Sequence, residues 1–142
     1  VKKVQKQIRL SVNQGAKVVF GNEVIKNYQE PTIVEEVRPG MPLFEEEVFG
    51  PIASFTRVKT RKEAIEIAKN SRFGLGTMLF TTDIEAARKL IGTIPDGAFF
   101  VNDMVKSDPR LPFGGTKASG YGRELSKEGM LEFVNRKTVY IK

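Results

Sequence analysis

Apolar residues recur at helical spacing from the start of the chain. Val1, Val4, Ile8 and Val12 fall on one face of a helix, and Gly15 is suited to end that helix. No capping residue precedes these positions. We therefore expect the sequence to begin within a helix, as a fragment or a late segment of a longer protein would.

Short apolar runs after this helix predict strands that are separated by loops. The runs at 17–20 and 32–34 are each bounded by turn-forming residues. Two prolines and a glycine at 39–42 exclude regular structure ahead of an acidic run. This part of the sequence is therefore expected to be rich in loops.

From residue 52 the pattern alternates between strands and helices. Strand-like runs at 52–58, 75–80 and 97–102 are separated by two predicted helices, which begin at capping boxes at 60–63 and 82–85. Parallel neighbouring strands need a crossover, and a helix is the usual one. The order predicts an α/β fold with a parallel βαβαβ sheet.

The last part of the chain combines a long irregular segment, 103–122, with a predicted helix at 126–135 and a terminal strand at 137–142. This short alternating strand would suit an edge that pairs across a subunit boundary. We accordingly divide the sequence into a main α/β portion, 1–124, and a terminal helix and strand, 125–142.

Composition limits the chemistry more than the fold. The chain has 142 residues, of which 40% are hydrophobic and 28% charged, as in an ordinary soluble globular protein. The absence of Cys and His excludes disulfides, thiolate nucleophiles, and thiolate or imidazole metal ligands. No apolar run is long enough for a membrane span and no leader opens the chain, so we expect a cytoplasmic protein without a membrane partner.

The net charge of +6 raises the question of nucleic acid. Positive and negative residues are mixed along most of the chain. The one concentrated basic run, Lys2, Lys3, Lys6 and Arg9, falls on the polar side of the first helix, where a solvated face is expected. We therefore expect no nucleic-acid partner; a nucleic-acid-binding protein would instead show affinity that falls steeply with salt.

The Gly-rich segment 112–124 invites a nucleotide-binding interpretation, which its spacing does not support. Lys117 follows Thr116 rather than the Gly of a phosphate loop, and Leu125 stands three residues after Gly122, where a dinucleotide fingerprint needs another Gly. A tight backbone path that uses Gly for positive φ or close approach is the better interpretation. A loop of this length inside an α/β unit is nevertheless more often functional than idle.

Three adjacent acids, Glu45, Glu46 and Glu47, form the first candidate site. Neighbouring side chains of an extended segment point alternately, so all three cannot serve one site. An exposed acidic loop is one interpretation. In the other, one carboxylate accepts hydrogen bonds from a sugar diol, with Phe49 packing beside it.

A second candidate site lies just beyond the end of the last parallel strand, where α/β sheets place their ligands. Lys106, Ser107 and Arg110 could hold an anionic small substrate by charge-assisted hydrogen bonds. The alternative is a solvated loop in which Asp108 pairs with Arg110.

Five motifs in order resemble the C-terminal third of an aldehyde dehydrogenase, and together they cover nearly the whole chain. They are Glu46–Pro51, Asn70–Leu75, Val101-Asn102, Pro112–Glu124, and Glu132-Phe133 with Lys137–Val139. The stretch 105–113 further resembles the NAD(P)-dependent succinate-semialdehyde dehydrogenases of that family.

The resemblance implies oxidation of an aldehyde, with succinate semialdehyde as the expected substrate and NAD or NADP as the cofactor. In the family a Cys thiolate attacks the carbonyl, hydride passes to the nicotinamide, and a Glu-activated water hydrolyses the thioester. The Cys, that Glu, the oxyanion-hole Asn and the dinucleotide-binding domain lie upstream of the region that this chain resembles. Lacking Cys, the chain alone is expected to be inactive; a non-catalytic truncated fragment or interaction module is the alternative.

The resemblance also assigns roles to individual residues. Glu47 matches the Glu that holds the nicotinamide ribose, and Phe49 matches the aromatic residue near the nicotinamide. Phe113 matches a wall of the substrate funnel, and Ser107 stands where semialdehyde-type members place a hydroxyl against the distal carboxylate of the substrate. We expect no catalytic residue and no metal ligand in this chain.

Further residues match the subunit interface of the family. Arg123 and the strand 137–142 correspond to elements at that interface, where the tail completes a sheet of the oligomerisation element. The resemblance makes 1–124 the C-terminal portion of the catalytic domain and 125–142 the oligomerisation part. A homo-oligomer, dimer or tetramer, is therefore expected for the full-length protein.

Overall fold

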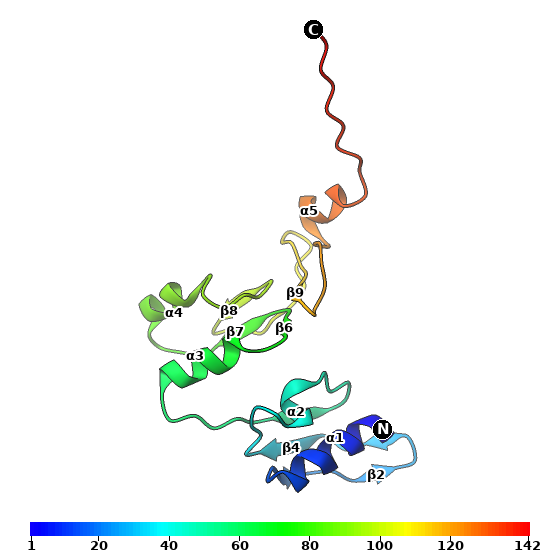
Figure 1. Cartoon of the computed structure of the whole chain (residues 1–142), viewed down its shortest axis with the longest axis vertical. Coiled ribbons are helices and arrows are strands. Elements are labelled where there is room, and N and C mark those ends of the chain that lie inside the picture. The colour runs from blue at the N-terminus through cyan, green and yellow to red at the C-terminus, as the bar shows by residue number, and fades with distance from the viewer. The chain divides into compact units, whose positions relative to one another are not determined.

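The computed structural model describes all residues, 1–142 (Figure 1). Backbone contacts divide the chain into a first unit, 1–64, and a second unit, 65–142. The elements of the first unit are α1 (Lys2–Asn13), β1 (Lys17–Phe20), β2 (Val24–Ile25), β3 (Tyr28–Gln29), β4 (Thr32–Glu35), α2 (Pro42–Glu45) and β5 (Ile52–Ser54).

The main sheet of the first unit has three strands in the order β1-β4-β5. The β1 strand runs antiparallel to β4 and has an irregularity between Val18 and Phe20, whereas β4 and β5 run parallel, with Thr32 opposite Ile52. The β2 and β3 strands form a separate antiparallel hairpin. This sheet fixes the position of the acidic segment, because that segment leads directly into β5.

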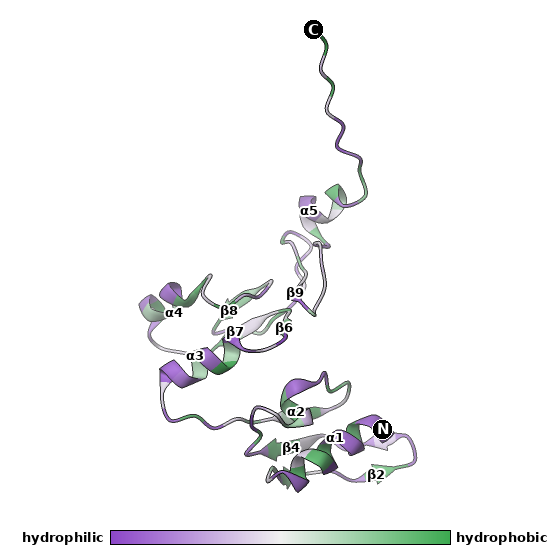
Figure 2. Cartoon of the chain, in the orientation of Figure 1, coloured by the Kyte–Doolittle hydropathy of each residue, from purple (hydrophilic) through white to green (hydrophobic).

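The core of the first unit lies between α1, α2 and β4. Val4 and Ile8 of α1 pack with Val34 and Leu43, all of them buried. Figure 2 shows hydrophobic and hydrophilic residues side by side in α1, as expected for a helix with one buried face. The Leu43 amide donates to the buried Ser11 hydroxyl at 3.1 Å, which joins the start of α2 to α1.

The second unit contains a parallel strand pair that is joined by a helix. The remaining elements are α3 (Arg61–Lys69), which spans the boundary between the units, β6 (Phe73–Gly74), β7 (Thr77–Leu79), α4 (Ile84–Leu90), β8 (Phe99–Val101), β9 (Thr116–Lys117) and α5 (Ser126–Leu131). The β7 and β8 strands pair in parallel, with Met78 opposite Phe100, and α4 is their crossover. The β6 and β9 strands pair antiparallel.

The predicted α/β fold with parallel strands is confirmed, although its strands are distributed differently. The predicted strand at 52–58 is β5, shortened, and it pairs with β4 instead of with the strand at 77–79. Backbone hydrogen bonds from the Thr32 amide to the Pro51 carbonyl and from the Phe55 amide to the Val34 carbonyl fix this pairing. Hydrophobic alternation predicts that a strand exists but not which neighbour it pairs with.

The helix starts follow the predicted capping chemistry with small shifts. At α3 the Thr60 hydroxyl accepts from the Glu63 amide at 3.2 Å, as predicted, but the Glu63 carboxylate accepts from the Lys59 amide instead of the Thr60 amide. The capping box predicted at 82–85 places the start of the helix one residue too early. Asp83 caps α4, because its carboxylate accepts from the Ala86 amide at 2.9 Å.

The sequence did not predict the β2–β3 hairpin, because each of its strands has only two residues, too few to show an alternating pattern. The Gln29 side chain is nevertheless buried, and its carbonyl oxygen accepts from the Gln5 amide group at 2.7 Å. Hydrogen bonding between side chains therefore allows a polar residue to be buried here.

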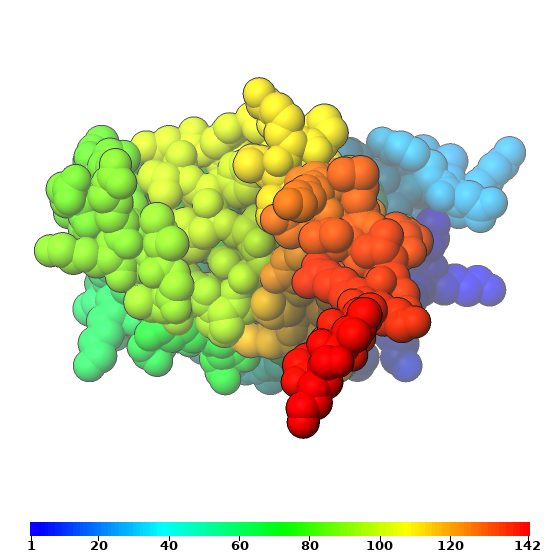
Figure 3. All heavy atoms as spheres, turned by 90° about the horizontal axis from the view of Figure 1, so that it is seen from above, coloured from blue at the N-terminus to red at the C-terminus, as the bar shows by residue number.

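The C-terminal residues follow the prediction only in part. The helix α5 ends at Leu131, and 137–142 form no strand within the single chain; in Figure 3 the last residues, coloured red, project as a narrow arm. Pairing of this segment with a second chain stays a prediction, as does the division into 1–124 and 125–142. The longest helix, α1, has 12 residues, and no helix combines the length and apolarity needed to cross a membrane.

Candidate functional site

The three adjacent acids of the first candidate site have different partners. One carboxylate oxygen of Glu45 accepts from the Gly40 amide at 2.8 Å, and one of Glu46 accepts from the Gln7 side-chain amide at 2.8 Å. The Glu47 carboxylate is exposed and makes no hydrogen bond or ion pair within the chain. Of the three acids, Glu47 alone therefore has its full acceptor capacity available for a ligand.

The backbone around Glu47 is held on both sides. Its carbonyl oxygen accepts from the Gln7 side-chain amide at 3.2 Å, and the next residue, Val48, packs against the core. At Gly50 an added Cβ would lie 3.0 Å from a methyl carbon of Val4, so the chain passes close to α1 there. The free carboxylate thus projects from a fixed stretch of backbone.

Phe49 lies two residues from Glu47 and is 88% exposed. An exposed aromatic ring two residues from an unpaired carboxylate suits a ligand that presents hydroxyl groups next to a flat ring, since a carboxylate accepts several hydrogen bonds and aromatic rings pack on one another. This arrangement fits the sugar-diol interpretation of the acidic run.

The second candidate site is the loop that follows β8. The Ser107 hydroxyl is exposed and makes no hydrogen bond within the chain. Both neighbouring cations are paired: the Lys106 ammonium lies 2.6 Å from Asp103, and the Arg110 guanidinium contacts both carboxylate oxygens of Asp108, at 2.6 and 2.9 Å. The alternative that paired Asp108 with Arg110 is therefore confirmed, and the suggestion that Lys106 or Arg110 adds free charge is not supported.

These pairs shift the acidity of the two aspartates. The Lys106 ammonium and the Met104 amide donate to Asp103 and hold the pKa of its carboxyl below its ordinary value of 3.8. Hydrogen bonds from the side chain and backbone of Arg110 lower the pKa of Asp108 in the same way. Both carboxylates therefore stay ionised at neutral pH and keep the loop cross-linked.

A cavity of about 340 Å³ adjoins this loop. Phe113, whose backbone pairs with Glu124 through two hydrogen bonds of 2.8 Å, forms part of its wall. Lys106 and Asp108, on either side of Ser107, also line the cavity. The remaining lining residues are Gly97, Ala98, Phe99, Phe100, Leu111 and Pro112. In Figure 3 the yellow stretch that contains this loop lies on the surface.

The Gly-rich segment closes the second unit by binding the end of α3 and β6. The Lys117 ammonium donates to the carbonyls of Lys69 and Ser71, at 3.0 and 2.7 Å, and the Gly74 amide donates to the Ser119 hydroxyl at 3.1 Å. We call residues 116–119 the clasp. Because the Lys117 ammonium donates to two backbone carbonyls, this residue stabilises the scaffold.

Close backbone approach confirms the interpretation of this segment as a tight path. A Cβ at Gly97 would lie 1.7 Å from the Gly114 carbonyl oxygen, and the Arg123 guanidinium donates to the Gly115 carbonyl at 2.9 Å. Only a residue without a side chain fits at Gly97. These contacts place Phe113 at the edge of the cavity.

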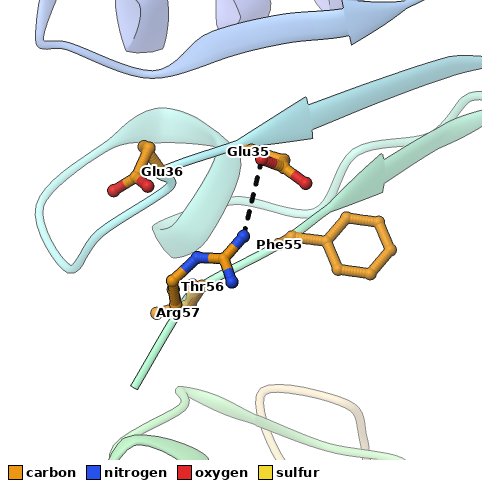
Figure 4. Close-up of a pocket in the computed structure, with 5 residues that line it drawn as sticks. All are labelled: Glu35, Glu36, Phe55, Thr56 and Arg57. Carbon is orange, nitrogen blue, oxygen red and sulfur yellow. Dashed lines mark ion pairs between the residues drawn. The ribbon is translucent and has the colours of Figure 1, made fainter. Parts of the chain in front are cut away.

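A second, smaller cavity of about 250 Å³ lies at the carboxyl ends of β4 and β5 (Figure 4). Arg57 lies 3.7 Å from Glu35, and Glu36 lies 3.3 Å from Arg38, so its charged groups are already paired. The Phe55 ring points away from Arg57 in Figure 4. This cavity therefore offers no free charged group to a ligand.

The structure places Glu47 and Phe49 two residues apart on one exposed segment of the first unit, and in the second unit it places Phe113 in the wall of a cavity that is also lined by the two neighbours of Ser107. No group of side chains suited to a metal ion is present. Sequence reasoning missed Gln7, although an amide on the apolar face of a helix was a signal. It also missed Phe99 and Phe100 as cavity walls, because a strand of apolar residues is usually interpreted as part of the hydrophobic core.

Comparison with known proteins gives a consistent result. The profile of the aldehyde dehydrogenase family matches residues 1–139. A Synechocystis protein named "probable succinate-semialdehyde dehydrogenase" (NADP(+)) is 46% identical over 138 residues, covering 95% of this chain and 30% of that protein. The Escherichia coli succinate semialdehyde dehydrogenase Sad (NAD(P)+) is 42% identical, over 94% of this chain and 30% of its own.

Solved structures agree with the sequence matches. The succinic semialdehyde dehydrogenase of Streptococcus pyogenes, in complex with NADP+, superimposes with a TM-score of 0.90 at 40% identity, covering 99% of this chain and 31% of that one. The chain thus spans about a third of the length of the relatives that it matches.

Proposed function

This chain belongs to the aldehyde dehydrogenase family, and we propose that it supplies the C-terminal part of an NAD(P)-dependent enzyme that oxidises succinate semialdehyde to succinate. In this proposal 1–124 belong to the catalytic domain and 125–142 to the oligomerisation element. The observation that carries it is the free Glu47 carboxylate on a fixed backbone, two residues before the exposed Phe49.

We assign the cofactor contacts of this chain to Glu47 and Phe49. An unpaired carboxylate can accept a hydrogen bond from each hydroxyl of the nicotinamide ribose, and these charge-assisted bonds are stronger than neutral ones. The Phe49 ring is free to pack near the nicotinamide. When bound, NAD(P)+ supplies the hydride acceptor of the oxidation. The choice between NAD and NADP rests on groups outside these residues.

We assign the substrate contacts to Ser107 and Phe113. The free Ser107 hydroxyl donates to the distal carboxylate of the semialdehyde, while Phe113 and the neighbouring apolar walls enclose its methylene groups. Because Lys106 and Arg110 are each paired with an aspartate, the hydroxyl is the free polar group of the loop. Orienting the substrate in this way lowers the entropic part of the barrier.

The bond-forming groups come from outside this chain. Oxidation consumes one aldehyde, one water and one NAD(P)+, and yields the carboxylate, NAD(P)H and two protons. The chain contains no Cys to act as nucleophile. In the proposal the nucleophile, the base and the dinucleotide-binding domain precede the region that corresponds to this chain. The chain by itself is therefore inactive.

The exposed apolar residues at the C-terminal end support a homo-oligomeric assembly. Phe133, Val139, Tyr140 and Ile141 are between 70% and 93% exposed, which is unusual for clustered side chains of that size. We propose that 137–142 add as an edge strand to a second subunit and that Arg123 lies near that interface, within a cytoplasmic dimer or tetramer.

An assay of NAD(P)H formation tests the proposal. A protein that carries this chain behind the missing upstream region should oxidise succinate semialdehyde with NAD or NADP, whereas the 142-residue chain alone should not. Activity of the isolated chain would contradict the assignment of the nucleophile, and failure of the longer protein to oxidise any aldehyde would contradict the function.

A further inference from the structure

Gln7 is a buried polar residue that touches the acidic segment from α1. Its side chain is 3% exposed, and its amide nitrogen donates both to the Glu46 carboxylate, at 2.8 Å, and to the Glu47 carbonyl, at 3.2 Å. Its side-chain carbonyl oxygen is buried without a hydrogen-bond partner. The packing of α1 would be better served by an apolar side chain, so the contribution of Gln7 lies in its two donated hydrogen bonds.

The direction of the Gln7 amide is fixed by its neighbours. Both groups that it contacts, the Glu46 carboxylate and the Glu47 carbonyl, only accept hydrogen bonds, so the NH₂ group and not the carbonyl has to face them. One hydrogen occupies the Glu46 carboxylate and the other holds the Glu47 backbone. Glu47 is left with a fixed backbone and a free carboxylate.

We propose that Gln7 is a positioning residue for the cofactor: it holds Glu47 in place for the ribose hydroxyls and keeps Glu46 from competing for them. This inference rests on the proposed function of Glu47. It predicts that changes at Gln7 weaken cofactor binding and leave the handling of the aldehyde unchanged, because Ser107 and Phe113 lie on other elements.

The experiment uses the full-length enzyme that contains this chain and measures the Kd for NAD(P)+ by calorimetry, together with the KM for succinate semialdehyde. Gln7→Met removes both donors at similar volume, and Gln7→Glu places a second carboxylate against Glu46. Each should raise the cofactor Kd by about tenfold, the effect of one misplaced charged hydrogen bond, with the aldehyde KM within about twofold.

Gln5→Met is the matched control. Gln5 lies on the same helix and donates to the side chains of Asn22 and Gln29, at 2.8 and 2.7 Å, without touching the acidic segment. It should lower the Tm but leave the cofactor Kd unchanged. An equal change in Kd for Gln5→Met and Gln7→Met would overturn the positioning role, as would an unchanged Kd in both Gln7 variants.

A double variant separates this inference from the proposed function. If Gln7 acts through Glu47, Gln7→Met should raise the cofactor Kd less than twofold when Glu47→Gln is already present. A Glu47→Gln variant with unchanged Kd would overturn the ribose assignment and the inference together. An affected Glu47→Gln variant on which Gln7→Met still adds its full tenfold effect would overturn the inference alone.

Discussion

The Asn102 side chain binds the backbone of Thr81 at two points: its oxygen accepts from the Thr81 amide at 2.8 Å, and its nitrogen donates to the Thr81 carbonyl at 2.9 Å. The side chain thereby continues the pairing of β7 and β8 beyond the end of both strands. Asn102 also has a φ of 56°, in the left-handed region that Asn tolerates better than most residues. The loop that carries Ser107 starts from this fixed point.

Replacing Asn102 should destabilise the second unit. Asn102→Ala loses both hydrogen bonds and places at positive φ a residue that tolerates the left-handed region less well than Asn, so the free energy of unfolding should fall by about 1–3 kcal/mol. Asn102→Gly loses the same bonds without the backbone strain, so its free energy of unfolding should fall less. Urea unfolding measures both, and an Asn102→Ala variant as stable as the unchanged chain would contradict the two-point contact.

The crossing of Gly97 and Gly114 predicts a larger effect. Because a Cβ at Gly97 would lie 1.7 Å from the Gly114 carbonyl oxygen, Gly97→Ala should lower the free energy of unfolding by about 3 kcal/mol or more. Gly92→Ala is the control, since its φ of 81° is strained but no atom lies within 4 Å of the added Cβ. The free energy of unfolding of Gly92→Ala should fall by about 1–2 kcal/mol. Thermal unfolding should rank the two variants in this order.

The ribose contact proposed for Glu47 predicts how cofactor binding responds to mutation. In the full-length enzyme Glu47→Gln should weaken NAD(P)+ binding by about tenfold and lower turnover, because the ribose hydroxyls lose a charged acceptor. Glu45→Gln should not, since the Glu45 carboxylate already accepts from the Gly40 amide. Steady-state kinetics with varied cofactor checks both, and equal effects would refute the distinction between the two acids.

The role proposed for Ser107 predicts a change in specificity. Ser107→Ala should lower kcat/KM for succinate semialdehyde by about tenfold, since the distal carboxylate loses a hydrogen-bond donor. An uncharged aldehyde of similar length should be oxidised as before. Competition between the two substrates measures the ratio of their kcat/KM values directly. Equal losses on both substrates would contradict the contact between Ser107 and the distal carboxylate.

The two loop ion pairs predict a pH dependence. The folded pKa of Asp103 and that of Asp108 lie below the ordinary 3.8, so the pairs contribute fully above that pH and are lost as the pH falls through the lower folded values. Carboxyl NMR titration should give midpoints below 3.8 for both residues. Lys106→Met should return the midpoint of Asp103 toward 3.8 and leave that of Asp108 nearly unchanged. A midpoint at or above 3.8 in the unchanged chain would contradict the pairing.

Local signals in the sequence were sufficient for most of the helices and strands. The spacing of Val4 and Ile8, and the Thr60 cap, predicted α1 and α3 because helix periodicity and capping act over a few residues. The pairing of β5 with β4 was not predictable in this way, since it depends on backbone hydrogen bonds between distant segments. The β2–β3 hairpin was missed because its two-residue strands are too short to show an alternating pattern.

The candidate site shows the same limit. Residue types and the family resemblance single out Glu47 and Ser107. Only the structure shows that Glu46 is occupied by Gln7, 39 positions earlier, and that Lys106 is neutralised by Asp103. Which charged group is free depends on such partners, and sequence spacing does not report them.

The clasp has a practical consequence for shortening this polypeptide. Residues 116–119 bind groups that lie 42 to 48 positions earlier in the chain, at the end of α3 and in β6, and Thr116 also donates to the Pro95 carbonyl, 21 positions earlier. A version truncated before Thr116 would leave β6 as a lone strand and the last carbonyls of α3 without their lysine. An engineered C-terminus or a protease cleavage site therefore has to lie after Ser119 if the preceding fifty or so residues are to keep their fold.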